Sequence, residues 1–269
     1  VCNEQNRLET INTEKNGDLE EVQTYQYDNN GNLLKAQTTP YVDGQAQAEA
    51  TVYENTYDEF NQITNTITID GKNITNKYNG EGLRVEKTEG SNTTKYIYEG
   101  TQVILELGAS NEEKARNLYG NNLISRTANS ETLYYMYNGH KDVTALIKQD
   151  GSIEAQYDYD AFGNHIEDTG SVENPYRYSG YQYDKETDLY YLNARMYDSK
   201  TARFLQEDTY LGEYNDPQSL NLYAYCKNEP IKHYDPTGHV IDTVFDVASL
   251  GFSVYDVWHN PKSVGSWIG

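Results

Sequence analysis

The residues with the greatest capacity for chemistry gather in one stretch, residues 190–239. Its acidic side chains include Asp208 and Asp235. Two carboxylates held close together can hydrolyse a peptide bond, because one takes a proton from water while the other protonates the carbonyl oxygen. The local sequence around Asp235 also has a simpler interpretation, since Asp-Pro-x-Gly is a good turn signal. Taken alone, the segment 235–238 therefore indicates a turn.

Six short blocks follow one another in this stretch with a defined order and spacing. They are Arg195-Met196-Tyr197-Asp198, Ala202-Arg203-Phe204, Asp208-Thr209, Asn221-Leu222-Tyr223-Ala224-Tyr225, Asn228-Glu229-Pro230 and Asp235-Pro236-Thr237-Gly238. Together they resemble the terminal core motif of the Rhs/YD-repeat family of polymorphic toxins, which includes wall-associated and teneurin-like YD shells. Ala202 stands where the family pattern has glycine, Thr209 where it has proline, and Glu229 interrupts the usual Asn-Asn-Pro.

The resemblance implies self-cleavage just after the last block, between His239 and Val240. It assigns the aspartyl-protease-like carboxylates to Asp208 and Asp235, and it places Arg195 beside them to hold a carboxylate or polarise the scissile carbonyl. Such a reaction within one chain needs geometry rather than affinity, because the reacting groups are tethered.

Two further residues of the motif have weaker claims to a role in cleavage. Asp198 is better explained as a turn or pairing residue than as a catalyst. Arg203 could support the site, or it could equally pair with one of the many acidic side chains. We treat Asp198 and Arg203 as possible supporting residues.

The composition favours a folded β protein that does not bind nucleic acid. The chain has 27 tyrosines among 269 residues, a formal net charge of −21 and 36% hydrophobic residues. Disordered acidic chains are poor in aromatic residues, whereas tyrosine suits the half-buried faces of sheets. Phosphate binding requires clustered Lys and Arg, which this sequence lacks. The tyrosines could also form a carbohydrate-binding surface, but cross-strand packing is the interpretation that we favour.

No cofactor or metal is expected from the sequence. Cys2 and Cys226 are too few and too isolated for a disulfide framework or a Cys-x-x-Cys metal site, and Cys226 is expected to be a buried apolar residue. The five histidines have no metal-binding spacing. A Ser/His/Asp triad remains open, although no G-x-S-x-G elbow occurs. No apolar run reaches the length of a membrane span.

Upstream of the motif, tyrosines followed by turn residues recur with a period near twenty. They are Tyr27, Tyr57, Tyr78, Tyr98, Tyr119, Tyr137 and Tyr159. The steps between them are 30, 21, 20, 21, 18 and 22 residues. One β-hairpin with its two turns has about this length, and an Asp or Asn followed three residues later by Gly favours a tight turn. The repeat resembles the YD signature and predicts turns near residues 29–32, 59–62, 79–82 and 161–164.

We therefore expect a mainly β protein of stacked antiparallel hairpins, part of a spiral β-cage. Residues 1–189 are expected to form the YD-repeat shell and residues 190–239 the Rhs-associated core with its autocleavage motif. Residues 240–269 would begin the C-terminal effector region as a short apolar helix, because large apolar residues recur there at two- to four-residue spacing. A second short helix is expected at 108–116, with Ser110 as its N-cap. Because the sequence starts within the repeat pattern, we expect a piece of a longer protein.

The resemblance implies the function of a bacterial toxin shell, secreted or at the cell surface, that acts in competition between bacteria. It would enclose its own C-terminal toxin and separate it covalently from the shell by single-turnover autoproteolysis, with the toxin remaining enclosed. Expected partners are that toxin region, the rest of the shell, and secretion machinery or an immunity protein. The alternative is a non-catalytic adhesion or carbohydrate-binding module of the cell surface.

Overall fold

A computed structural model describes residues 1–239 and 242–243 of the chain. Antiparallel β-structure dominates, and the only helical segments among the described residues are three short 3₁₀ turns. The largest sheet has 16 strands that pair almost entirely in chain order, so that each strand is hydrogen-bonded to its neighbours in sequence. This arrangement confirms the stacked antiparallel hairpins expected from the tyrosine period.

The strands of the large sheet have the following bounds: β1 (Thr10–Lys15), β2 (Asp18–Tyr27), β3 (Leu33–Val42), β4 (Gln45–Ala46), β5 (Ala50–Tyr57), β6 (Ile63–Thr68), β7 (Asn73–Tyr78), β8 (Arg84–Glu89), β9 (Asn92–Glu99), β10 (Gln102–Leu107), β11 (Glu113–Tyr119), β12 (Leu123–Ala128), β13 (Glu131–Tyr137), β14 (Val143–Ile147), β15 (Ile153–Tyr159) and β16 (His165–Thr169). Only β4 lies off the main path, pairing with β3 alone.

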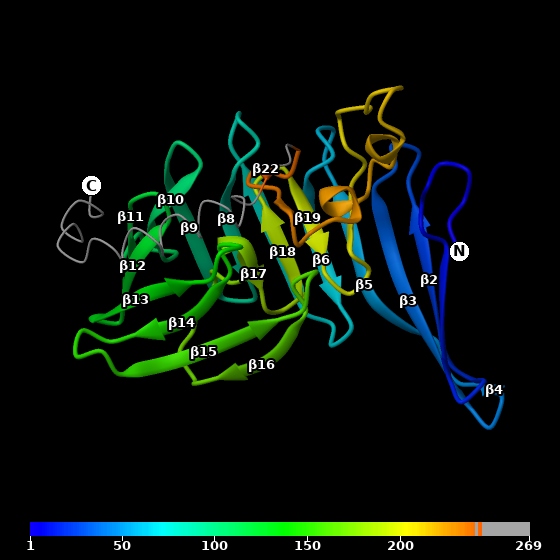
Figure 1. The fold of residues 1–269 in the computed structure, drawn as a ribbon, viewed down its shortest axis with the longest axis horizontal. Helices are drawn as coiled ribbons and strands as arrows, with labels where there is room; N and C mark the ends of the chain where they lie inside the picture. Colours follow the sequence, from blue (N-terminus) through cyan, green and yellow to red (C-terminus); the bar gives the residue numbers. More distant parts are fainter. Residues whose placement is uncertain (240–241, 244–269) are drawn as a thin grey trace, which may run out of the picture.

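A smaller sheet follows in the chain and lies against one face of the large sheet (Figure 1). Its strands are β17 (Gln182–Asp184), β18 (Leu189–Leu192), β19 (Arg195–Asp198) and β20 (Arg203–Phe204). A two-stranded sheet joins β21 (His233–Tyr234) to β22 (Asp242–Thr243). The 3₁₀ turns are η1 (Tyr178–Gly180), η2 (Pro217–Leu220) and η3 (Tyr225–Asn228). We call β17–β20 the inner sheet.

Each predicted hairpin turn is closed by its Asp or Asn side chain. In the turn after β5, the Asp58 carboxylate accepts hydrogen bonds from the backbone N–H groups of Phe60 and Gln62, both at 2.9 Å. Asn61, three residues after the aspartate, has a left-handed φ of 62°, a conformation that asparagine and glycine adopt at low cost. Equivalent turns at residues 28–32, 79–83 and 160–164 carry glycine at that position. The four turns expected from the sequence are thus confirmed.

Four of the repeated tyrosines, Tyr57, Tyr78, Tyr98 and Tyr137, tie a hairpin to the previous one. The Tyr78 hydroxyl and the Asn76 amide both donate to the carbonyl oxygen of Ile63, at 2.9 and 3.1 Å. Tyr57 and Asn55 do the same to the carbonyl of Leu33. An Asn-x-Tyr sequence at the end of a strand therefore binds a backbone carbonyl of the preceding hairpin. At these positions the hydroxyl contact explains the preference for tyrosine over phenylalanine.

The inner sheet closes a hydrophobic core against the large sheet. One cluster joins Tyr53 and Ile63 of the large sheet to Tyr191 and Met196 of the inner sheet. A second buried cluster belongs to the inner block itself and is rich in tyrosine, including Tyr190 and other rings that are fully shielded from solvent. The buried location of these rings agrees with their interpretation as packing residues.

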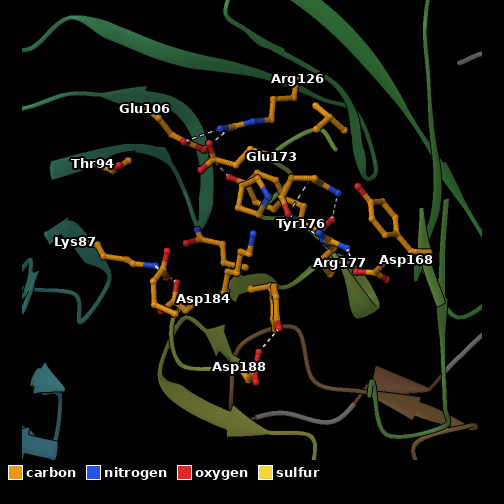
Figure 2. A pocket seen from close by; sticks show the side chains of 18 of the residues that line it. Lys87, Thr94, Glu106, Arg126, Asp168, Glu173, Tyr176, Arg177, Asp184 and Asp188 are labelled. Carbon is orange, nitrogen blue, oxygen red and sulfur yellow. Dashed lines mark hydrogen bonds and ion pairs between the residues drawn. The ribbon is translucent and has the colours of Figure 1, made fainter. Parts of the chain in front are cut away.

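Paired charges line a polar cavity of about 650 Å³ between the two sheets (Figure 2). Arg126 pairs with Glu106 on the large sheet, and Lys87 contacts Asp184 of the inner sheet at 3.0 Å (Figure 2). The fully buried Arg84 donates to the same carboxylate at 3.0 Å. The contacts of Arg84 and Lys87 with Asp184 hold β17 against the strands of the large sheet.

Two local expectations fail. Residues 108–116 form a tight turn and the start of β11 rather than a helix, because the Glu112 carboxylate accepts a hydrogen bond from the Ser110 N–H and closes the turn at once. Asp242 and Thr243, placed in the expected C-terminal helix, form strand β22 through pairing with β21. The rest of that expected helix, residues 240–241 and 244–269, lies outside the described residues.

Candidate active site

Three separate segments bring Arg195, Asp208 and Asp235 together. Arg195 begins β19, Asp208 follows β20, and Asp235 follows β21. The hairpin of β19 and β20 turns through Ala202, which has a left-handed φ of 58° at the place where the motif usually has glycine. Asp208 is then fixed by its backbone N–H, which donates to the carbonyl of Leu222 at 3.1 Å.

The Arg195 guanidinium is the centre of the site. Its Nη2 lies 2.6 Å from Oδ2 of Asp208 and 3.9 Å from Oδ2 of Asp235. Nη1 donates to the carbonyl of Leu222 at 3.0 Å, and Nε donates to the carbonyl of Gly238. The flat face of the group stacks on the Phe204 ring, 3.7 Å from its centroid. Every edge and one face of the guanidinium are thus in use, which fixes its position.

Asp235 organises the segment that precedes the expected cleavage point. Its Oδ1 accepts three backbone N–H hydrogen bonds, from Thr237 at 3.2 Å, Gly238 at 2.8 Å and His239 at 3.1 Å. Its own N–H donates to the Tyr181 hydroxyl at 2.7 Å. The turn predicted from Asp-Pro-x-Gly is therefore present, and its aspartate also faces the arginine. The turn and the active-site interpretations are compatible.

Gly238 is required at the tightest point of this turn. It has a φ of +80°, and a β-carbon built on it would lie 2.5 Å from the carbonyl oxygen of Leu192. Any side chain would therefore push the segment away from the inner sheet. Close backbone contact at this point is what brings the Gly238 carbonyl within reach of Arg195.

His239 completes the arrangement through its side chain. Its ring nitrogen Nδ1 lies 3.0 Å from Oδ1 of Asp208. Both oxygens of Asp208 are thus engaged, one by Arg195 and the other by His239. Val240, on the other side of the expected scissile bond, lies outside the described residues.

The environments of the two aspartates shift their pKa values in opposite directions. Burial acts to raise the pKa of Asp208, but hydrogen bonding to His239 and the Arg195 charge outweigh it and hold that pKa below its usual value. For Asp235, burial dominates the opposing effects of Arg195 and the three backbone donors, so its pKa is raised. Burial likewise lowers the pKa of Arg195, against the attraction of both carboxylates. Asp208 is therefore the anion of the pair, and Asp235 holds a proton more readily.

A cavity of about 380 Å³ opens directly onto these groups. Arg195, Asp208, Asp235 and His239 all line it, together with Tyr210 and other residues of the 210–227 segment. Such a volume exceeds the space that a single water occupies, and its polar groups can hydrogen-bond water. Water therefore has access to the carboxylates.

The two possible supporting residues lie elsewhere. Asp198 is buried at the end of β19, where its carboxylate accepts the N–H of Lys200 at 2.9 Å. Arg203 donates to the carbonyl of Asn6 and lies over the Tyr223 ring. These partners belong to the turn after β19, to the N-terminal segment and to the 221–225 block, so both residues have structural contacts that explain them. Tyr181 and the His239 ring, by contrast, were not foreseen as contacts of the aspartates, because they reach the site only through tertiary packing.

A serine, a histidine and an aspartate do meet at a second place, but not as a catalytic triad. Nδ1 of His140 lies 2.8 Å from Asp142 and 3.3 Å from the Ser179 hydroxyl, while Nε2 lies 3.1 Å from the carbonyl of His233. A triad needs the serine and the carboxylate on opposite ring nitrogens. In this cluster both share one nitrogen, so His140 cannot relay a proton between them.

The described part of the chain offers neither a metal site nor a membrane span. Residues 1–239 and 242–243 contain no group of three or more His, Cys, Asp or Glu side chains placed to hold a metal ion. Within the same residues there is no helix with the length and apolarity that a bilayer crossing requires. Cys226 is buried and its pKa is raised by that burial, whereas Cys2 is exposed.

Comparison with known proteins identifies the fold family. Residues 55–231 match the family model described as Teneurin YD-shell. The chain is 40% identical to the tRNA3(Ser)-specific nuclease WapA of Bacillus spizizenii over 202 residues, 72% of this chain and 8% of that protein. It is also 40% identical to toxin protein Tse5 of Pseudomonas aeruginosa over 70 residues, 26% of this chain and 5% of that protein. The chain thus spans less than a tenth of these relatives.

Solved structures show the same architecture at low sequence identity. The crystal structure of TcdB2-TccC3-TEV superimposes with a TM-score of 0.58 at 19% identity, covering 81% of this chain and 13% of that chain. At this identity the match shows the fold alone. The family model, which spans more than half of the residues, shows the family. The chain therefore belongs to the Teneurin YD-shell family and forms part of a YD/Rhs-type shell.

Proposed function

We propose that this YD shell cuts its own chain between His239 and Val240, by an aspartyl-protease-like reaction that each molecule performs once. The observation that carries the proposal is how the residues before that bond are bound. Arg195 binds the carbonyl of Gly238, and Asp208 binds the ring of His239. The groups suited to the chemistry thus hold the two residues that precede the bond.

The opposite pKa shifts of the two aspartates suggest their roles. Asp208, as the anion, takes a proton from a water molecule in the adjoining cavity. The hydroxide oxygen attacks the carbonyl carbon of His239, while Asp235 donates its proton to the carbonyl oxygen. The C–N bond then breaks as Asp208 passes the proton from water to the nitrogen of Val240, and the carbonyl re-forms as a hydroxyl proton returns to Asp235. Oδ1 of Asp235 already accepts three backbone hydrogen bonds, so its proton belongs on Oδ2, beside Arg195.

Positioning of the scissile segment is the main advantage that the fold gives this reaction. Three backbone N–H groups bind to Asp235, and the Ala194 N–H donates to the carbonyl of Thr237 at 3.2 Å. A chain held in this way does not need to bind a separate substrate, and such tethering can lower the activation barrier substantially. A single turnover follows, because the substrate is part of the enzyme.

The biological setting is also part of the proposal. One relative is called a tRNA nuclease and another a toxin. By analogy, residues 1–189 would form shell, residues 190–239 the cleaving core, and residues 240–269 the start of an enclosed toxin region. The protein would act outside the producing bacterium, with the rest of the shell, secretion machinery and an immunity protein as partners.

Incubation of the purified chain, followed by intact mass measurement, tests the cleavage. Asp208→Asn and Asp235→Asn should each remain uncut, because an amide neither takes a proton from water nor donates one in the way the mechanism requires. Asp198→Asn is the matched control, since Asp198 is another buried aspartate of residues 190–239 with a raised pKa. Full-rate cutting in Asp208→Asn would refute the assignment. A wild-type chain that stays intact would favour the alternative of a non-catalytic adhesion or carbohydrate-binding module.

A further inference from the structure

We propose that His239 is a positioning residue, which selects the bond to be cut by docking its imidazole on Asp208. This inference rests on the proposed self-cleavage and identifies what determines its site. It concerns the side chain of the residue just before the scissile bond.

His239 is held at two points, and each point involves one of the two aspartates. Its backbone N–H donates to Oδ1 of Asp235 at 3.1 Å. Its ring Nδ1 lies 3.0 Å from Oδ1 of Asp208. The carbonyl group of the same residue is the one to be attacked. Fixing both the backbone and the ring leaves that carbonyl little freedom to turn away from the site.

The direction of the ring contact follows from the ionisation of Asp208. Arg195 lies 2.6 Å from the other oxygen of this carboxylate and stabilises its anionic form. An ionised carboxylate can only accept hydrogen bonds, so Nδ1 must carry the hydrogen. Oδ1 also accepts the backbone N–H of Tyr210 at 3.0 Å, so both of its lone pairs are used. Oδ2, which Arg195 contacts, keeps a further lone pair for water. His239 can therefore orient the carboxylate without blocking its action as a base.

The neighbouring residues could not replace this contact. If the segment slipped by one residue, Gly238 or Val240 would face Asp208, and neither side chain can donate a hydrogen bond. Such a slip would also disturb the three backbone contacts to Asp235. Of Gly238, His239 and Val240, only His239 has a ring that can donate a hydrogen bond to Asp208.

The test compares three variants in the full 269-residue chain. His239→Leu keeps the bulk but loses the donor, His239→Asn places an amide N–H near the position of Nδ1, and His239→Ala leaves room for added imidazole. Cleavage is followed over time by intact mass, which reports both rate and position. Circular dichroism verifies that each variant is folded.

We expect His239→Leu to be cut roughly 10- to 100-fold more slowly, as fits the loss of a hydrogen bond to a charged acceptor. His239→Asn should retain most of the rate, and imidazole should accelerate His239→Ala. A merely structural role for His239 would give no recovery with imidazole. Wild-type rate and position in His239→Leu would overturn this inference while leaving self-cleavage intact. An uncut wild-type chain would instead overturn the proposed function itself.

Discussion

Removing the Asp184 carboxylate should destabilise the whole fold, because this group compensates two buried cations. Arg84 is 1% exposed, and its Nη2 lies 3.0 Å from Oδ1 of Asp184. Lys87 lies 3.0 Å from the same oxygen. In Asp184→Ala, Arg84 would keep only the Gln182 amide oxygen, at 3.1 Å, and cation–π contacts with tyrosine rings. Breaking a buried pair on one side typically costs about 3–5 kcal/mol.

This loss would be a large part of the stability of an ordinary domain, which is roughly 5–15 kcal/mol. Urea denaturation followed by tyrosine fluorescence and circular dichroism measures it. Glu113→Gln is the control, since it breaks the solvent-exposed pair with Arg116 and should change the midpoint little. The double replacement of Arg84 by Met and Asp184 by Leu should recover much of the loss, because no charge is then left uncompensated.

The effect also has a defined pH dependence. Burial acts to raise the pKa of Asp184, but Arg84 and Lys87 outweigh it and hold that pKa well below its ordinary value of 3.8. A depressed pKa contributes stability that is present above 3.8 and lost as pH falls toward the folded-state pKa. The difference between wild type and Asp184→Ala should therefore shrink below about pH 4. A loss under about 1 kcal/mol at neutral pH, or a difference that does not change with acid, would refute this reasoning.

Three further predictions concern the rate of cleavage, the turn of the core and the repeat. The acid Asp235 has a raised pKa and the base Asp208 a lowered one. Cleavage should therefore slow as pH rises through the pKa of Asp235 and as pH falls through the pKa of Asp208. A rate that climbs steadily to alkaline pH would contradict the assigned roles. Ala202→Gly should raise the free energy of unfolding by about 0.5–1 kcal/mol in urea titrations, because relief of the left-handed φ of 58° outweighs the added flexibility of the unfolded chain. A loss of stability would show that the turn is unstrained. Tyr78→Phe should lower the free energy of unfolding by about 1 kcal/mol, because it removes the hydroxyl that donates to the Ile63 carbonyl. Tyr214→Phe, at a position that is 95% exposed, should leave the stability unchanged. Equal effects of the two changes would mean that the repeat contact is not stabilising.

The repeat could be predicted because its determinants are local. Asp58 closes its turn through residues two and four positions away, and the tyrosine period follows from hairpin length. The helix expected at 108–116 failed for a related reason. Ser110 and the acids after it suit a helix start, but Asn111 adopts a left-handed φ of 65°, and pairing of β10 with β11 then extends the chain.

The candidate site was only partly accessible from sequence. The motif named Arg195, Asp208 and Asp235, and the structure brings these three together. The contact of Tyr181 with Asp235 joins residues 54 positions apart, and that of His239 with Asp208 joins residues 31 positions apart. Such contacts depend on how β19, β20 and β21 pack, which no local pattern encodes. The opposite pKa shifts of the two aspartates arise from the same packing.

The most direct test of the central claim is the mass of the purified wild-type chain after incubation in mildly acidic buffer. Self-cleavage predicts two fragments, one ending at His239 and the other beginning at Val240, in amounts that grow at a rate independent of protein concentration. A fragment pair from a different bond, or a chain that remains intact while Asp208→Asn behaves identically, would contradict it.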